Sequence, residues 1–203
     1  MNSADWMDEK EGKGQHAGTR SIATDRLVLR PFCMQDAASM LRNWIGDPEV
    51  QADYGEPAYD RMTEVQALLR TWTDSYARPE FYRWAIVLHK DDEDGKDGEC
   101  IGQIAFCSVD EEHRFADVEY CIGRAYQNRG YASEALKAVI VFTFAHTGLH
   151  RLQAFHRGRN RASSRVLQKS GMNMEGTLRQ SYYYSDTNEY DDRVYYGIVK
   201  DGL

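Results

Sequence analysis

The chain has 203 residues, of which 42% are hydrophobic and 28% charged, and these values are typical of one soluble globular domain. Its formal net charge of -7 argues against a general nucleic-acid-binding protein, because affinity for a duplex comes mostly from cationic side chains that meet phosphates. No apolar run approaches the ~18 residues that span a bilayer, and residues 1–20 lack the apolar segment of a secretory signal, so we expect a cytoplasmic protein with no membrane partner.

Residues 1–20 are charged, rich in glycine and without hydrophobic periodicity, so we interpret them as a disordered tail and 21–203 as the single folded domain. From there on, the spacing of apolar residues predicts strands and helices in turn. In chain order the predicted elements are a strand within 24–32, a helix capped by Asp36, a helix over 63–76, strands over 81–89, 100–109 and 115–123, a helix that ends at Gly148, a strand over 151–156, a helix over 162–170, and strands over 172–184 and 190–199. This order predicts a mixed α/β domain.

The residues that commonly bind metals do not form a recognisable site in the sequence. The four cysteines (Cys33, Cys100, Cys107 and Cys121) form no CxxC pair and no zinc-ligand spacing, so free thiols in a reducing compartment are expected. The acidic run at 91–99 lacks the spacing of an EF-hand loop, and we interpret it as a solvated turn between two strands. No metal cofactor is expected.

The segment YQNRGYASEAL (126–136) joins a predicted strand to a predicted helix. Free amides and the positive end of the dipole make a helix start an anion site, and Gly130 allows a phosphate to approach the backbone closely. The lysine that a nucleotide-binding P-loop requires is absent. By itself, this turn is also consistent with a simple tight connection between a strand and a helix.

The surrounding sequence supplies a family resemblance over about residues 24–199. The run EYCIGRAYQNRGYASEALKAVI (119–140) resembles the acetyl-CoA motif of the GNAT superfamily of N-acyltransferases, whose Q/R-x-x-G-x-G/A element corresponds to QNRGYA (127–132). NRASSRVLQKSGM (160–172) resembles that family's N-x-x-S-x-x-x-x-x-K-x-G-F segment, with Met172 in place of the phenylalanine. TDRLVLRPF near the start and GTLRQSYYY with EYDDRVYYGIV near the end resemble the subgroup that contains the ribosomal-protein N-terminal acetyltransferases (RimJ/RimL-like).

The resemblance implies one domain with a central, largely antiparallel twisted sheet of about seven strands, flanked by about four helices and splayed at the strand that holds the cofactor. It implies acetyl-CoA as cosubstrate, with the pyrophosphate on the amides of 127–132 and the pantetheine arm paired with the edge of 120–123. The residues that it assigns to cofactor binding are Tyr120, Cys121, Ile122, Gly123, Gln127, Asn128, Arg129, Gly130, Tyr131, Ala132, Asn160 and Ser163.

Acetyl transfer to an amine requires a base for the amine, a donor for the developing oxyanion and a route for the leaving thiolate. The resemblance makes Glu119 the candidate base, and Asp117 is the alternative because both lie on one face of the predicted strand. A backbone N–H near Cys121 or Ile122 is the candidate oxyanion donor.

Help for the leaving sulfur is assigned to a serine. Ser163 corresponds to a serine that some relatives place near the thiol, and Ser164 is an alternative in the same pair. Many other relatives use a tyrosine, and Leu167 stands in that place here. Because a thiol has a pKa of ~8.5, the thiolate is a tolerable leaving group and strong acid help is optional.

The resemblance implies a primary amine as acceptor, and an N-terminal α-amine of a protein is the leading expectation. An α-amine with a pKa of ~7.7–8.0 demands less of a weak base than a lysine with a pKa of ~10.4. A small amine such as an antibiotic or a polyamine is the alternative acceptor, and a non-catalytic acyl-CoA-binding module is the alternative function. Monomer and homodimer both stay open, and no direct nucleic-acid partner is expected.

Overall fold

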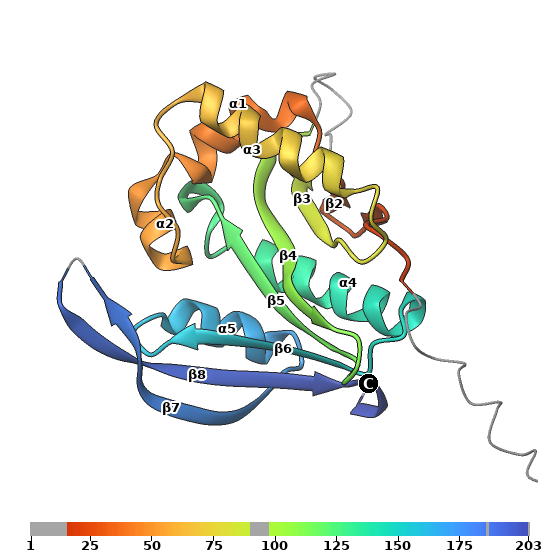
Figure 1. Ribbon diagram of the computed structural model, residues 1–203, viewed down its shortest axis with the longest axis vertical. Coiled ribbons are helices and arrows are strands. Elements are labelled where there is room, and N and C mark those ends of the chain that lie inside the picture. The colour runs from red at the N-terminus through yellow and green to blue at the C-terminus, as the bar shows by residue number, and fades with distance from the viewer. Residues whose placement is uncertain (1–15, 90–97, 186, 203) are drawn as a thin grey trace, which may run out of the picture.

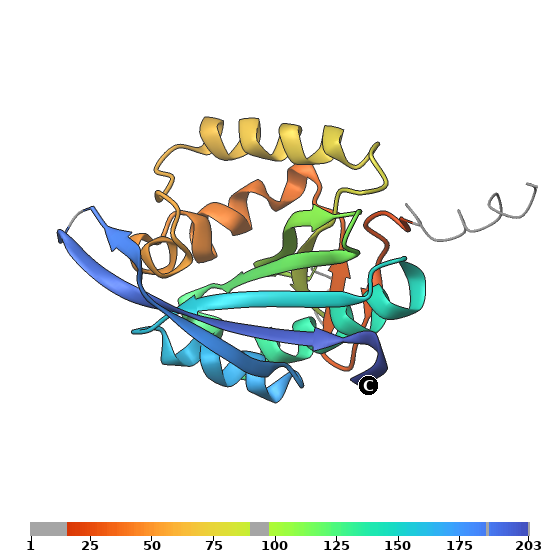
Figure 2. The same ribbon diagram turned by 60° about the horizontal axis from the view of Figure 1, so that its bottom comes forward.

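A single eight-stranded sheet organises the residues that the computed structural model describes, which are 16–89, 98–185 and 187–202. Its strands are β1 (Ile22–Ala23), β2 (Leu27–Arg30), β3 (Arg83–Leu88), β4 (Cys100–Asp110), β5 (Phe115–Ile122), β6 (Arg151–Arg157), β7 (Asn173–Tyr184) and β8 (Glu189–Val199). The α-helices are α1 (Ala37–Met40), α2 (Pro48–Tyr54), α3 (Met62–Ser75), α4 (Tyr131–His146) and α5 (Arg161–Lys169). Figure 1 labels all of these elements except β1, and Figure 2 shows the sheet between α1 and α3 on one side and α4 and α5 on the other.

The strand order is β1-β2-β3-β4-β5-β6-β8-β7, and all neighbouring strands are antiparallel except β5 and β6. The parallel strands β5 and β6 pair only near their starts, as far as Asp117 opposite Gln153. Beyond this point β5 follows β4 to Ile122 and β6 follows β8 to Arg157, so the two strands separate in the opening that we call the wedge (Figure 1). The predicted splay at the cofactor strand is therefore confirmed.

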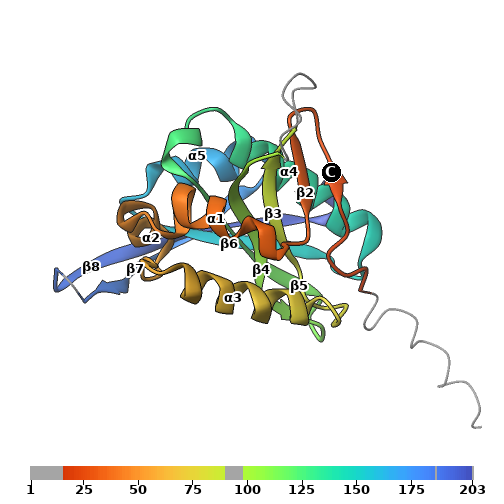
Figure 3. The same ribbon diagram turned by 90° about the horizontal axis from the view of Figure 1, so that it is seen from above.

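Side chains alternate along β5 between two hydrophobic clusters. Ala116, Val118 and Ile122 join the cluster that contains the buried face of α4. Cys121 joins the cluster built around α1 and α3, which lie in front of β3 and β4 in Figure 3. Because alternate residues of a strand share a face, Glu119 lies on the side of Cys121, toward α1–α3.

The structure has one helix and one strand beyond those predicted. Asp47 caps α2 by accepting hydrogen bonds from the amides of Glu49 and Val50, at 3.0 and 3.4 Å, and Pro48 follows at the first helical position. These signals stand in the sequence, but so short a helix carries no clear apolar period, which is why it was not predicted. The additional strand, β1, consists of Ile22 and Ala23 alone.

The helix predicted after Asp36 is present and continues from α1 through one π-helical turn at Leu41–Ile45. The side chain of Asp36 does not act as its N-cap. The buried Asp36 carboxylate instead accepts from the amide of Cys33 at 2.8 Å and from the guanidinium of Arg30 at 2.7 and 2.8 Å. This bidentate pair fixes the end of β2 against the start of the α1 region.

Residues 16–20, which the sequence placed in a tail, make defined contacts beside β3. The amide of Ala17 donates to the Tyr82 hydroxyl at 3.0 Å, and the indole of Trp84 donates to the carbonyl of Arg20 at 2.8 Å. Residues 1–15 of that tail and 90–97 of the acidic turn lie outside the described residues. The four cysteines are free thiols, as predicted, and no helix in the described part of the chain is long and apolar enough to cross a membrane.

Candidate active site

The turn between β5 and α4 presents a row of free backbone amides at the mouth of the wedge. Asn128 and Gly130 both have left-handed backbone conformations, with φ of 61° and 84°. The first amide of the new helix to find a carbonyl is that of Glu134, which donates to Gly130 at 3.0 Å. Among the described residues, no acceptor faces the amides of residues 128–133. Successive amides in such a turn, at a helix start, form an anion-binding concavity, which we call the amide cradle.

Arg26, which the sequence analysis did not select, holds the cradle in shape. Its guanidinium donates to the carbonyl of Arg129 at 3.0 Å, pairs with Glu134 at 2.6 Å and lies 4.7 Å from the ring centre of Tyr131. Burial opposes the charge of Glu134, but hydrogen bonds from Thr24 and Arg26 outweigh it and keep the pKa of that carboxyl below its usual value. The β1–β2 turn is thereby connected to the first turn of α4. No local sequence pattern predicts a contact between residues as far apart in the chain as Arg26 and Glu134.

Two residues assigned to cofactor binding have their amides already in use. The amide of Gln127 donates to the carbonyl of Arg124 at 3.2 Å, and its side chain donates to the carbonyl of Ile122 at 3.0 Å. The amide of Gly123 donates to the carbonyl of Ile101 at 2.8 Å. Gln127 and Gly123 therefore shape the turn, and the amides open to an anion begin one residue later, at Asn128.

The free edge of β5 borders the wedge. Residues 118–122 pair with β4 on one side, while no residue of β6 pairs with them on the other. Alternate residues of a strand direct their N–H and C=O groups to opposite neighbours, so part of this backbone faces the wedge unpaired. Such groups are costly to leave without partners, and a ligand with its own amides would satisfy them in the manner of an added strand.

The start of α5 forms the opposite wall of the wedge. Asn160 caps this helix, because its side-chain oxygen accepts from the amide of Ser163 at 3.0 Å. The amide nitrogen of the same side chain has no acceptor among the described residues. The oxygen of the Asn160 side chain thus caps the helix while its NH2 group remains available as a donor, and substitutions can test these two roles separately.

We expect Asn160→Asp to retain the cap and to lose the donor, whereas Asn160→Ala loses both. In thermal unfolding, only the alanine variant should lose the roughly 1 kcal/mol that such a cap contributes. In calorimetric titration with acetyl-CoA, both variants should bind roughly three- to tenfold more weakly. An aspartate variant with unchanged affinity would remove the side-chain donor from cofactor binding.

Ser163 is placed beside a tyrosine of the opposite strand. Its hydroxyl lies 2.8 Å from the phenol oxygen of Tyr120, which reaches it from β5. Burial raises the pKa of Tyr120 above its ordinary value, so the phenol stays protonated and can donate to Ser163. The hydroxyl of Ser164 instead lies 3.0 Å from that of Tyr196, and Leu167 is fully buried in the core. Of the serine pair, Ser163 is the one with a hydrogen bond to β5 among the described residues.

Glu119 and Asp117 have different surroundings. Asp117 accepts from the side chain of Gln153 at 2.8 Å through one oxygen and from the hydroxyl of Ser108 through the other. Glu119 is 27% exposed and pairs with Arg83 at 3.0 Å through one oxygen only. The Tyr54 hydroxyl is a further hydrogen-bond neighbour of Glu119. Because Asp117 has both oxygens bound by Gln153 and Ser108 whereas Glu119 is partly exposed, Glu119 is the better candidate for the base.

Aromatic and polar side chains from three elements surround the Glu119–Arg83 pair. The Arg83 guanidinium lies 4.5 Å from the ring centre of Trp72 in α3 and donates to Gln103, whose amide donates to the Tyr54 hydroxyl at 2.9 Å. Burial, and then the nearby negative charge of Glu119, raise the pKa of Tyr54. A neutral phenol and a guanidinium thus flank a carboxylate that remains partly open to solvent.

The family profile described as "Acetyltransferase (GNAT) domain" matches residues 26–173. The chain belongs to the GNAT acetyltransferase family. It is 35% identical over 179 residues to the uncharacterized N-acetyltransferase YoaA of Bacillus subtilis. This alignment covers 88% of this chain and 96% of that protein. It is 32% identical over 107 residues to the ribosomal-protein-serine acetyltransferase of Escherichia coli, in an alignment that covers 52% of this chain and 58% of that protein. Mycobacterium smegmatis RimJ, solved in complex with CoA-disulfide, shares the fold with a TM-score of 0.75 at 22% identity, covering 94% of this chain and 92% of that one.

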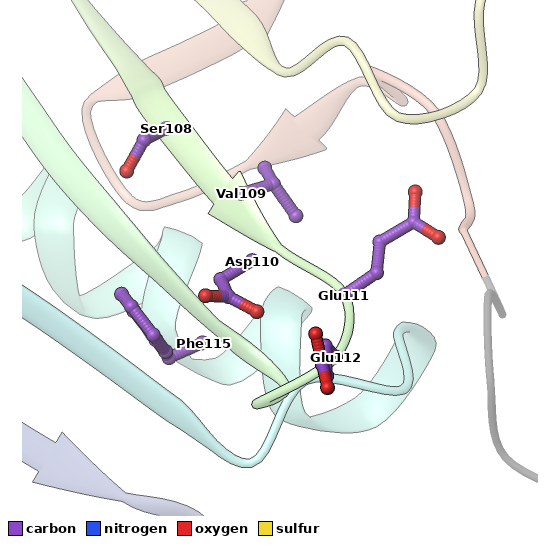
Figure 4. Close-up of a pocket in the computed structure, with 6 residues that line it drawn as sticks. All are labelled: Ser108, Val109, Asp110, Glu111, Glu112 and Phe115. Carbon is purple, nitrogen blue, oxygen red and sulfur yellow. The ribbon is translucent and has the colours of Figure 1, made fainter.

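Membership of the GNAT family confirms the recognition made from the sequence. A hollow at the other end of β5, in the β4–β5 turn, is a different kind of site (Figure 4). It is lined by Ser108, Val109, Asp110, Glu111, Glu112 and Phe115. The carboxylates of Asp110, Glu111 and Glu112 would repel a phosphate, so this hollow does not suit the phosphate groups of a cofactor.

Proposed function

We propose that this GNAT acetyltransferase transfers the acetyl group of acetyl-CoA to the N-terminal α-amine of a protein. The observation that carries the proposal is the run of unpaired amides at 128–133, which lies where the free edge of β5 ends. An anion on these amides and a chain of amides along β5 would satisfy both sets of groups at once. A pyrophosphate followed by a pantetheine arm has this chemistry.

On the donor side, the residues of the chain bind and orient. The cradle, held by Arg26, would receive the pyrophosphate, and Asn160 would donate from the opposite wall. The free amides of β5 nearest the wedge would receive the thioester oxygen as negative charge develops on it. Holding the donor in this way supplies much of the acceleration without a covalent intermediate on the protein.

On the acceptor side, Glu119 would take the proton of the attacking amine, directly or through one water. The amine nitrogen forms a bond to the thioester carbon, and the bond between that carbon and sulfur breaks. The sulfur leaves as a thiolate, and Ser163, which can accept a hydrogen bond from Tyr120, is placed to donate its own proton toward it. The products are an amide and coenzyme A.

The α-amine is favoured over a lysine side chain by the strength of the available base. Glu119 is partly exposed and paired with Arg83, and a carboxylate is in general a weak base for an amine. An α-amine at neutral pH needs only about 1 kcal/mol to reach its free-base form, against more than 4 kcal/mol for a lysine amine. The similarity to the E. coli ribosomal-protein-serine acetyltransferase supports a protein acceptor.

The proposal is tested by calorimetric titration with acetyl-CoA, followed by thiol-release assays on two acceptor panels. One panel holds short peptides with free N-termini, each matched to an N-formylated peptide, and the other holds small amines, including polyamines. We expect micromolar binding and turnover on the free peptides only. Turnover on small amines alone would assign a small-molecule acceptor, binding without any turnover would assign an acyl-CoA-binding module, and failure to bind would overturn the proposal entirely.

A further inference from the structure

Arg193, on the open face of the sheet beyond the wedge, is a cation with no counter-ion among the described residues. In the register of the sheet it stands between Arg157 of β6 and Leu178 of β7, on the face that β5 gives to Glu119. Its guanidinium lies 4.9 Å from the ring centre of Phe155 and 5.5 Å from that of Tyr182. Its Nε is buried and has no hydrogen-bond partner, and no carboxylate of the described residues pairs with it.

The carboxylates that the adjacent strands present on this face are engaged elsewhere. Glu189 and Asp191 of β8 both pair with Arg159, at 3.3 and 3.5 Å, and Glu175 of β7 pairs with Arg151. Asp191 also accepts from the amide of Arg159 and from the Tyr184 hydroxyl. The positive charge of Arg193 is therefore not neutralised from within this face, although the chain as a whole carries a net charge of -7.

The guanidinium of the neighbouring cation, Arg157, already has hydrogen-bond partners within the protein. Its guanidinium donates to the carbonyls of Ala52 and Asp53 at the end of α2, and it lies 4.9 Å from the ring centre of Tyr182. The next residue of α2 is Tyr54, whose hydroxyl accepts from Gln103 beside Arg83 and Glu119. Arg157 and α2 thus connect the Arg193 surface to the candidate base, across the mouth of the wedge.

The surface around Arg193 is exposed and apolar. Phe155 is 43% exposed and Leu178 is 53% exposed. On the same face of the sheet, residues of β3, β4 and β5 are buried under the helices α1–α3. Figure 1 shows β6, β8 and β7 on the side of the wedge opposite β5, with the β7–β8 hairpin reaching past α2. These strands continue, beyond the wedge, the face of the sheet that carries Glu119.

We propose that Arg193 binds a carboxylate of the acceptor, carried by an acidic residue that follows the reactive N-terminus within a few positions. This inference rests on the proposed function and names its substrate class: protein N-termini with an early aspartate or glutamate. A single free guanidinium matches a single carboxylate, which it can grip through two parallel hydrogen bonds. The rings of Phe155 and Tyr182 hold the guanidinium plane in place and lower the entropy lost on binding.

The test compares acetylation of peptides that differ in one charge. Each peptide begins with serine and carries aspartate, asparagine or lysine at the second, third or fourth position, and kcat/KM is measured at low and at 0.5 M salt. For the wild type we expect one position at which aspartate is favoured over asparagine by roughly three- to tenfold, with lysine least favoured and the preference weakened by salt.

Three substitutions at Arg193 and one control separate a charge contact from a structural role. Arg193→Gln should abolish the preference for aspartate, Arg193→Glu should reverse it toward lysine, and Arg193→Lys should retain part of it. The control is Arg70→Gln on the exposed side of α3, which should leave the preference intact. Acetyl-CoA affinity should stay within about twofold in all four variants, since none contacts the donor side.

The outcomes distinguish this inference from the proposed function. Efficient acetylation of all peptides without any charge preference, or a preference that survives Arg193→Gln, would overturn the role of Arg193 and leave the proposed function standing. Absence of turnover on every peptide would overturn both. Reversal of the preference in Arg193→Glu is the result that a merely structural arginine does not produce.

Discussion

Glu119→Gln is expected to lower kcat by roughly 10²-fold or more, within the range of 10²–10⁴ that a positioned general base contributes. Glutamine keeps the size of the side chain and can still accept from Arg83, so the pair at 3.0 Å loses its charge and not its geometry. What disappears is the ability to take a proton from the amine. The affinity for acetyl-CoA, measured by calorimetric titration, should stay unchanged, because Glu119 lies on the acceptor side of β5.

Asp117→Asn is the matched control for Glu119→Gln. It removes a carboxylate from the same strand and the same face, two residues away, but one whose oxygens are held by Gln153 and Ser108. We expect its kcat to remain within a few-fold of the wild type. Equal losses in the two variants, or full activity in Glu119→Gln, would exclude Glu119 as the base.

Gly130→Ala is expected to weaken acetyl-CoA binding about tenfold or more, which corresponds to the loss of one charge-assisted hydrogen bond. The residue has a φ of 84°, which an alanine adopts only at a cost of about 1–2 kcal/mol. A methyl group there would lie 3.4 Å from the Arg26 guanidinium and in the path of a phosphate. Strain and crowding together displace the amides that form the cradle.

Gly171→Ala separates the loss of binding from the backbone strain. Gly171 has a φ of 88°, and an added methyl would meet only the side chain of Ile198, at 3.8 Å. Both variants should lose a similar free energy of unfolding in chemical denaturation, since both place an alanine in the left-handed region. Only Gly130→Ala should raise the Kd for acetyl-CoA; an equal rise in both would mean that general destabilisation, and not the cradle, is responsible.

Local sequence was sufficient for features that depend on neighbours along the chain. Gly130 occupies a left-handed position directly before α4, and Asn160 stands at the start of α5 as its cap, so both could be placed from the motif that contains them. The same holds for the alternation of β5, which put Asp117 and Glu119 on one face. The short helix α2 was missed although its Asp-Pro start is present, because seven residues are too few for a periodic pattern to stand out.

The sequence by itself determined the family, the order of the longer elements and the segment that forms the cradle, because a turn and a helix start are built from consecutive residues. Only the tertiary structure decided which groups remain free to act. The hydrogen-bond partners of Arg26, Glu119 and Ser163 are separated from them by dozens of residues in the chain. A donor or acceptor that is bonded to such a distant residue is no longer available to a ligand. That Glu119 pairs with Arg83, and that Arg193 has no counter-ion in the part of the chain that the structure describes, are consequences of packing that no spacing in the sequence encodes.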